Sequence, residues 1–337
     1  MIDTNRIESI LSWKAPEGTA FESSDVNLTD YFASSPEDTA EDEEIVEEFW
    51  LQEVERKPLN PRYPKDTAVV AIDSTSFVLG QISDGVVGAI RASVVTKPAG
   101  EPDWNLERYG PHIVTITEQV KDEFYRELHR VVYDTESSPR PPDLVGTLDQ
   151  ARNLFERYLQ LEVVKQHKES LVLLDGSLIA APLAESSSFI QRLVSQAAEN
   201  VNSLVAVSKT TKLVLERSRR SILSLLEGAG YPCYVGGIRR HIRQSRDRYL
   251  GEIYVTRFTP TGEAFRVDLP DNTPVSHEQI LNSVSGLAGD YGYPEELRLA
   301  HMTCVLSAIE ILELQSAAIA LHNLVVKDES RTRLFPI

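Results

Sequence analysis

The stretch Ser170–Leu178 reads S-L-V-L-L-D-G-S-L. Its apolar run has the length of a strand that is buried on both faces, and it is too short for a helix. The run ends on Asp175, and the small residues after it let the backbone turn sharply and let a ligand approach. A carboxylate in this position is either a turn or capping residue or part of a functional site.

A second stretch repeats this arrangement earlier in the chain. Residues 68–73 read A-V-V-A-I-D, so a β-branched apolar run ends on Asp73 and passes into the small residues of 74–76. Two neighbouring strands that both end in aspartate would bring their carboxylates side by side. Like charges that close cannot both stay ionised cheaply without a cation between them.

Two predicted helices add further polar groups. The first covers Thr147 to Gln166, and the position that continues its apolar stripe is Glu162, which either points inward or reaches solvent at a fraying helix end. A buried acid is costly unless it is paired or bound to a metal. The second helix follows Tyr293, and His301 lies on its apolar face as either a core residue or a ligand. Carboxylates with one imidazole suit Mg²⁺ or Mn²⁺, and two such ions about 4 Å apart support phosphodiester hydrolysis.

Charge is distributed unevenly along the 337 residues. The net charge is −17, which argues against a protein that coats nucleic acid through its whole surface, and the first 60 residues carry sixteen acids against four bases. That acidic segment is either a solvated helical arm or a docking surface for a basic partner. Residues 205–248 reverse the pattern with ten Lys and Arg against three acids, as a nucleic-acid or anion track requires. Lys209 lies there in a hydroxyl-rich loop suited to phosphate.

Other features place the protein in a broad class. The two cysteines, Cys233 and Cys304, lie far apart without metal-type spacing, which favours a reduced intracellular protein. No apolar run approaches 18 residues, and residues 1–6 lack the apolar region of a signal peptide. We therefore expect a cytoplasmic protein without a membrane segment. The sequence contains no P-loop, Rossmann glycine fingerprint, HExxH or G-x-S-x-G motif.

Over roughly residues 67–310 the chain resembles the NurA nucleases. The resemblance is carried, in order, by A-V-V-A-I-D-S-T-S-F at 68–77, L-V-L-L-D-G-S-L at 171–178, V-S-K-T-T-K at 207–212, T-R-F and R-V-D-L-P within 256–270, and G-Y-P-x6-H-M at 292–302. It implies an RNase H-like core, cleavage of DNA with Mn²⁺, and cooperation with the hexameric HerA translocase in DNA end resection.

The resemblance also implies the role of particular residues. Asp73 and Asp175 are similar to the two strand ligands of the metal, and His301 to the histidine of the late helix. Glu162 matches the helix glutamate if the connection to the Asp175 strand varies in length, with Glu156 as the alternative, although the predicted helix turns Glu156 outward. The resemblance further implies that Tyr293 positions the phosphate or the water and that Lys209 offsets phosphate charge.

The predicted fold is therefore an RNase H-like α/β domain, a mixed sheet flanked by helices, preceded by an acidic helical N-terminal arm. We expect the arm and a linker at 1–66, the nuclease domain at 67–325 with 97–146 partly an insertion or loop, and a tail at 326–337.

The predicted function is a two-metal DNA nuclease that uses Mn²⁺ or Mg²⁺, acting as a 5′–3′ exonuclease, an endonuclease or both. We expect a homodimer that acts with a HerA-type ATPase on DNA ends, in repair or in defence. Two alternatives stay open at this point: a catalytically silent scaffold that tethers DNA or an ATPase, and a metal-dependent phosphatase of small substrates.

Overall fold

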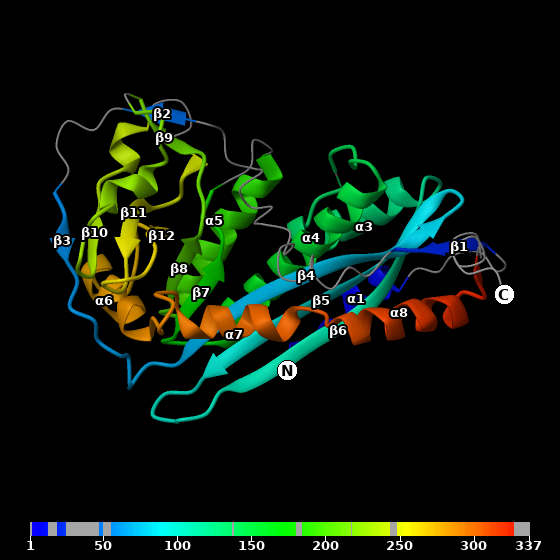
Figure 1. Ribbon diagram of the computed structural model, residues 1–337, viewed down its shortest axis with the longest axis horizontal. Coiled ribbons are helices and arrows are strands. Elements are labelled where there is room, and N and C mark those ends of the chain that lie inside the picture. Colours follow the sequence, from blue (N-terminus) through cyan, green and yellow to red (C-terminus); the bar gives the residue numbers. More distant parts are fainter. Residues whose placement is uncertain are drawn as a thin grey trace, which may run out of the picture.

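Eleven strands form one mixed sheet in the computed structural model, which describes residues 2–12, 19–24, 47–49, 55–136, 138–179, 184–216, 218–242 and 248–326 (Figure 1). In sheet order they are β13 (Val325–Val326), β1 (Ala20–Ser23), β4 (Val69–Ile82), β7 (Leu171–Asp175), β8 (Ser203–Ser208), β12 (Phe265–Leu269), β11 (Glu252–Arg257), β10 (Cys233–Val235) and β3 (Lys57–Pro58). The long strands β5 (Gly85–Lys97) and β6 (Asn105–Thr117) extend the sheet from the other edge of β4, whereas β2 (Glu47–Phe49) and β9 (Leu213–Leu215) pair separately.

The centre of the sheet is parallel and fully buried. β7 lies between β4 and β8 and runs parallel to both. Each of its apolar residues is at most 3% exposed, because helices cover both faces of the sheet. The prediction of a strand buried on both faces, made from the apolar run alone, is confirmed.

Asp73 does not end its strand, contrary to the prediction. β4 continues to Ile82 because β5 pairs with it along its whole length. Along the opposite edge of β4 the neighbouring strand changes. β7 pairs with residues 69–72 of β4, and β1 pairs with residues 80–82. Asp73 therefore lies where β7 ends and one edge of β4 loses its partner.

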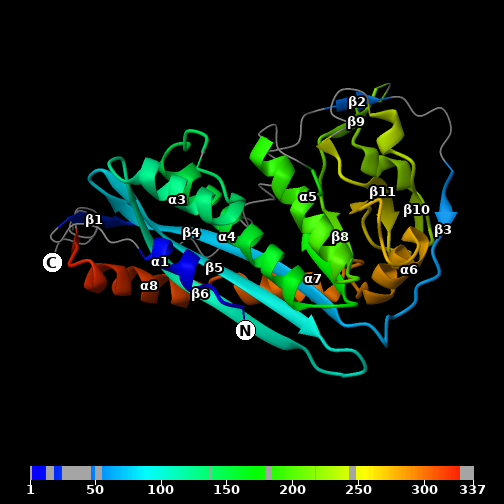
Figure 2. The same ribbon diagram turned by 180° about the vertical axis from the view of Figure 1, so that it is seen from behind.

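Helices cover the sheet on both sides (Figures 1 and 2). On one side α4 (Leu144–Gln166) packs with α1 (Asn5–Leu11), α3 (Lys121–Tyr133) and α5 (Ala184–Glu199); on the other are α6 (His277–Leu287), α7 (Glu295–Cys304) and α8 (Ala308–Leu321). Short 3₁₀ helices η2 (Ile222–Leu226) and η3 (Arg239–His241) lie near β10 and β11. Side chains alternate along β4, so Val70 and Ile72 pack with the α4 layer while Val69 and Ala71 pack with α6 and α7. This is the predicted RNase H-like α/β architecture.

Much of the predicted insertion at 97–146 is regular structure. Residues 105–117 form β6, and 121–133 form α3, whose side chains Phe124, Leu128 and Val132 are at most 2% exposed. The prediction of a loop was wrong there, because these side chains recur at i, i+4 and i+8, a spacing that favours a helix with one apolar face. β6 in turn completes a long hairpin with β5.

The described part of the N-terminal segment is not a detached arm. Ile7 and Leu11 of α1 have no exposed surface, and β1 pairs with β4 and β13 in the main sheet. These residues are thus integrated into the fold. The acidic run at 37–44 lies outside the described residues, as does most of the predicted tail.

The stretch Glu295–Leu321 is long and apolar enough to cross a membrane by length and composition, and no other described helix is. It consists of two helices, however, because α7 ends at Cys304 and Ser307 caps α8 with a capping box. α7 packs against β4 and β5. The stretch is therefore part of the α/β domain.

An ion pair fastens the start of α8 to the sheet. Arg91 of β5 donates to the Glu310 carboxylate at 2.6 Å and to the carbonyl of Val305 at 3.3 Å. Burial by itself would raise the pKa of Glu310, but hydrogen bonds from Arg91 and Ser307 outweigh it and lower the pKa to about 2.

We expect Glu310→Gln to destabilise the protein by about 1 kcal/mol near neutral pH. The effect is this small because over a third of the Glu310 side chain is exposed, and solvent screens the ion pair. A depressed carboxyl pKa stabilises the fold above the unfolded pKa, so the difference should vanish as the pH falls from about 4.5 to about 2. Urea unfolding of both proteins across this range measures it. A difference that persists at pH 2 would contradict the ion-pair explanation.

Candidate active site

Asp73 and Asp175 lie side by side where the parallel pairing of β4 with β7 ends. Ile72 is in register with Leu174, so the next residues along the two strands are the two aspartates, on strands about 4.8 Å apart. Their side chains are 10% and 7% exposed. After Asp175 the chain turns through Gly176 at φ +106°, a conformation that favours glycine. The side-by-side placement predicted from the sequence is confirmed.

α7 brings His301 and Cys304 to Asp73. The Nδ1 atom of His301 lies 2.8 Å from Oδ2 of Asp73, and the thiol of Cys304 donates to the same oxygen at 3.6 Å. The hydrogen bond with Asp73 raises the pKa of His301, although burial opposes the shift. Burial raises the pKa of Cys304 well above its usual value, so the thiol is neutral.

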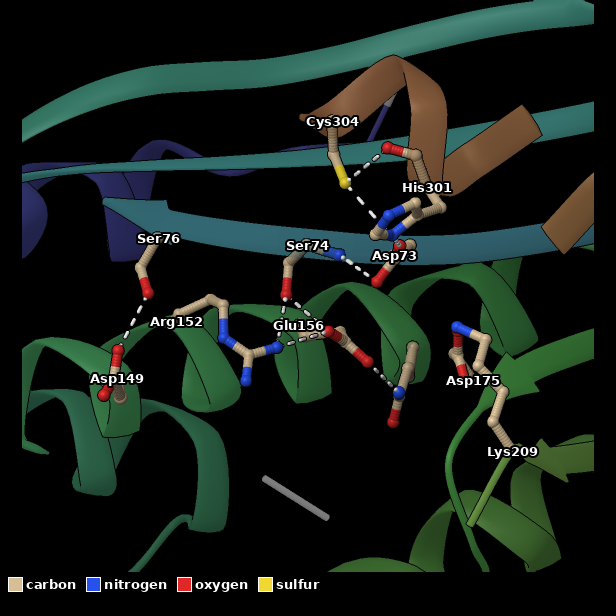
Figure 3. A network of polar contacts seen from close by, with 11 residues as sticks. Asp73, Ser74, Ser76, Asp149, Arg152, Glu156, Asp175, Lys209, His301 and Cys304 are labelled. Atoms are coloured by element: carbon tan, nitrogen blue, oxygen red, sulfur yellow. Dashed lines mark hydrogen bonds and ion pairs between the residues drawn. The ribbon is translucent and has the colours of Figure 1, made fainter. Parts of the chain in front are cut away.

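The third carboxylate of the cluster is Glu156 of α4. Its side chain is 12% exposed, and Oε2 accepts a hydrogen bond from the hydroxyl of Ser74, the residue after Asp73. Successive residues of a strand point to opposite faces, so Asp73 faces α7 while Ser74 faces α4. Asp73 and Asp175 both act electrostatically on Glu156. The three carboxylates therefore form one cluster, with Asp73 and Glu156 on opposite sides of the edge of β4 (Figure 3).

The structure places Glu162 away from this cluster and corrects the predicted helix carboxylate. Six residues of α-helix rotate a side chain by about 120° from its starting direction and move it about 9 Å along the axis. Glu162 accordingly forms an ion pair with Lys165 at 2.7 Å and acts electrostatically on Tyr158. The prediction that Glu156 points outward was wrong, because α4 is packed on more than one side.

A polar stripe on α4 supports Glu156. Gln160 donates to its Oε1 at 3.0 Å, and Arg152 lies 3.5 Å from its Oε2. One turn further back, Asp149 accepts a hydrogen bond from Ser76 of β4 at 2.9 Å. Positions 149, 152, 156 and 160 are spaced by three or four residues and therefore share one face of the helix. This polar periodicity is visible in the sequence, but only the partners that β4 supplies, Ser74 and Ser76, show that it faces the site.

Lys209 and Tyr293 complete one side of the site. The ammonium group of Lys209 lies 2.9 Å from Oδ2 of Asp175, and 5.2 Å from the centre of the Tyr293 ring. Tyr293 is 8% exposed and packs against Phe265. Both predicted residues are therefore at the site, and Lys209 is paired with a carboxylate in this structure.

The electrostatics of the cluster fit a cation. Burial, together with the charges of Asp73 and Asp175, raises the pKa of Glu156 to about 7 against the opposing effect of Arg152. Burial also raises the pKa of Asp175, although Lys209 opposes it. Oδ1 of Asp175 is buried and has no hydrogen-bond partner among the described residues. Carboxylates this close, one with an unsatisfied oxygen, form a donor set that suits a hard divalent ion.

The raised pKa of Glu156 predicts how the stability of the metal-free protein depends on pH. A carboxyl whose folded pKa exceeds its unfolded pKa stabilises the fold fully below the unfolded value, and this contribution is lost as the pH rises through the folded value. We expect the free energy of unfolding to fall by about 3 kcal/mol between pH 4.5 and about 7, since Glu156 shifts from 4.5 to about 7.

Denaturant unfolding in EDTA measures this change. Glu156→Gln should remove most of the slope and raise the stability at pH 7.5, because a neutral amide replaces a buried charge. Glu162→Gln, on the same helix, serves as the matched control and should keep the slope. An unchanged slope in Glu156→Gln would refute the assigned shift.

Three acids lie together where the parallel pairing of an RNase H-like sheet ends. This arrangement is typical of a nuclease. The chain belongs to the NurA domain family, whose family model matches residues 67–306.

Two solved structures are similar to this chain over most of its length. The NurA nuclease from Sulfolobus solfataricus is similar with 16% identity and a TM-score of 0.48, covering 88% of this chain and 93% of that one. The endonuclease V from Streptomyces avermitilis is similar with 14% identity and a TM-score of 0.39, covering 87% of this chain and 95% of that one. No curated protein sequence matches the chain.

Proposed function

We propose that this nuclease hydrolyses DNA phosphodiester bonds with two Mn²⁺ ions, with Mg²⁺ as an alternative metal. The observation that supports it most directly is the convergence of Asp73, Glu156 and Asp175. Among the described residues, Arg152 and Lys209 pair with Glu156 and Asp175, and His301 contacts Asp73. Glu156 and Asp175 have raised pKa values in spite of these partners, so the cluster lacks positive charge. Divalent ions would supply that charge.

Asp73, Glu156, Asp175 and His301 would hold the ions. When bound, such ions lower the pKa of a water molecule and stabilise the charge on the attacking and leaving oxygens. Among the residues themselves, Ser74 and Gln160 orient the Glu156 carboxylate through hydrogen bonds. The hydrogen bond with Asp73 raises the pKa of His301 in the metal-free protein, whereas a histidine that held an ion would be neutral and would keep Nδ1 for Asp73.

Lys209 and Tyr293 would act on the substrate. With a metal bound to Asp175, the ammonium group of Lys209 is positioned to exchange its carboxylate partner for a phosphate oxygen. The Tyr293 ring lies beneath that ammonium group and holds it at the site. Lys209 would thus offset phosphate charge, and Tyr293 would position the phosphate or the attacking water.

The partners proposed are DNA ends, a second copy of the chain and a HerA-type hexameric ATPase, in repair or defence in the cytoplasm. Family membership supports these partners. Light scattering of the purified protein, followed by mixing with the ATPase, tests the dimer and the complex separately. A monomer at micromolar concentration would exclude the dimer.

Cleavage assays with Mn²⁺ and with EDTA test the proposed chemistry. Single-stranded DNA, duplex DNA and p-nitrophenyl phosphate should be compared at the same enzyme concentration. We expect cleavage of DNA that is abolished by EDTA, as either exonuclease or endonuclease products. Binding of DNA without cleavage would indicate a silent scaffold, and preferential hydrolysis of p-nitrophenyl phosphate would indicate a phosphatase.

A further inference from the structure

A cavity of about 650 Å³ opens beside the acidic cluster. It lies between the loop after β8, η2 with its flanking residues, and the turn that joins β11 to β12. Ligand pockets in proteins have volumes of about 300–1,000 Å³, so the cavity has room for a nucleotide. None of the roles assigned above uses it.

Lys209 connects this cavity to the acidic cluster. It lines the cavity, and its ammonium group lies 2.9 Å from Asp175. Phe265 also lines the cavity, and its ring centre lies 5.2 Å from that of Tyr293. A DNA strand whose scissile phosphate lies at the acidic cluster would therefore have the cavity within reach of its adjoining nucleotide.

The cavity wall carries positive charge that is not fully paired. Of its two carboxylates, Glu227 is bound by Arg220, and Glu263 is exposed. Arg257 donates to the carbonyl of Leu226 at 3.2 Å, but no carboxylate of the described residues lies within ion-pair distance of it. Its Nε is buried without a hydrogen-bond partner among the same residues. An anionic ligand in the cavity would therefore meet the charge of Arg257, although the buried Nε is itself out of its reach.

The remaining surface matches the other parts of a nucleotide. Leu223, Ala264 and Phe265 form an apolar portion against which a base can pack, and Ser221 and Ser224 place hydroxyl groups near it. One inorganic phosphate would leave that apolar portion unused. A guanidinium without a carboxylate partner among the described residues, together with an apolar wall, therefore favours a nucleotide over a simple anion.

We propose that this cavity binds the nucleotide adjoining the scissile phosphate, with Arg257 contacting its phosphate and the apolar wall contacting its base. The inference rests on the proposed function, since it assumes that DNA is cut at the neighbouring carboxylates. It makes the cavity a substrate subsite that selects nucleotides over other phosphodiesters.

Binding of thymidine 5′-monophosphate to the full-length protein in EDTA tests the subsite without catalysis. Replacing Arg257 with glutamine should weaken binding about tenfold, the equivalent of one charge-assisted hydrogen bond. Arg130→Gln on α3, which removes an arginine paired with Glu127, is the matched control and should leave it unchanged. Equal affinity of wild type and Arg257→Gln would overturn the proposal. Inorganic phosphate binding as tightly as the nucleotide would also overturn it.

A second measurement compares two substrates with Mn²⁺. For oligo(dT), Arg257→Gln should raise KM about tenfold and reduce the salt dependence of binding by about one phosphate contact. For bis(p-nitrophenyl) phosphate, which has no nucleoside, the rate should change less than about twofold. An equal loss on both substrates would refute the subsite. If the wild type cleaves neither substrate, the proposed function fails, whereas nucleotide binding in EDTA still decides the subsite.

Discussion

Replacing Glu156 with glutamine should reduce Mn²⁺-dependent DNA cleavage at least about a thousandfold, equivalent to about 4 kcal/mol of lost transition-state stabilisation. The amide has the shape of the carboxylate but cannot balance a divalent ion, and Ser74, Arg152 and Gln160 would still hold it in place. The fold should survive, because the substitution removes a charge that lies close to two other carboxylates and adds none. Steady-state cleavage with a thermal unfolding control measures both effects.

Glu162→Gln is the decisive comparison for this prediction. It changes the same residue type on the same helix, but it removes only a surface ion pair with Lys165. Its activity should stay within about twofold of wild type. The opposite ranking, with Glu162→Gln inactive and Glu156→Gln active, would refute the site built from the structure.

Replacing Asp73 with asparagine should also reduce cleavage about a thousandfold or more and abolish stabilisation by Mn²⁺. Asp73 is the residue on which the site converges, since His301, Cys304 and the backbone N–H of Ser74 all contact its carboxylate. Mn²⁺ should raise the unfolding temperature of the wild type and not of the variant. Asp84→Asn, in the β4–β5 turn, removes the same charge and should respond like wild type.

A double variant tests whether Asp73 and Asp175 act on the same ions. Residues that serve one metal centre act as a unit, so Asp73→Asn combined with Asp175→Asn should be no slower than either single variant. Multiplicative losses would show that the two carboxylates act independently. That result would contradict a shared metal centre while leaving the family assignment intact.

Sequence patterns predicted the strand carboxylates well for a simple reason. A run such as L-V-L-L followed by D-G is typical of a buried strand that ends in a tight turn, and its parallel pairing with the A-V-V-A-I-D strand brings the two aspartates side by side. The placement of Asp73, Asp175, His301 and Lys209 in one region follows from local patterns and the resemblance. Their chemical roles stay predictions.

Glu156 could not be chosen from the apolar pattern of its helix. α4 packs on the sheet with one side and on α3 and α5 with others, so buried residues surround much of its circumference. A single apolar stripe therefore does not identify the inward face. The polar spacing at 149, 152, 156 and 160 carries the information, but it takes on meaning only when β4 supplies Ser74 and Ser76 as partners.

The amino-acid sequence alone determined the family, the buried parallel strands and the two aspartates that end up side by side, because these depend on short-range patterns of burial and turning. The tertiary structure alone decided that Asp73 lies within a long strand, that Glu156 and not Glu162 joins the carboxylates, and that a cavity adjoins Lys209. The first two features depend on where the edge of β4 is left without a neighbouring strand and on which side of α4 contacts that edge. No local pattern specifies either of them.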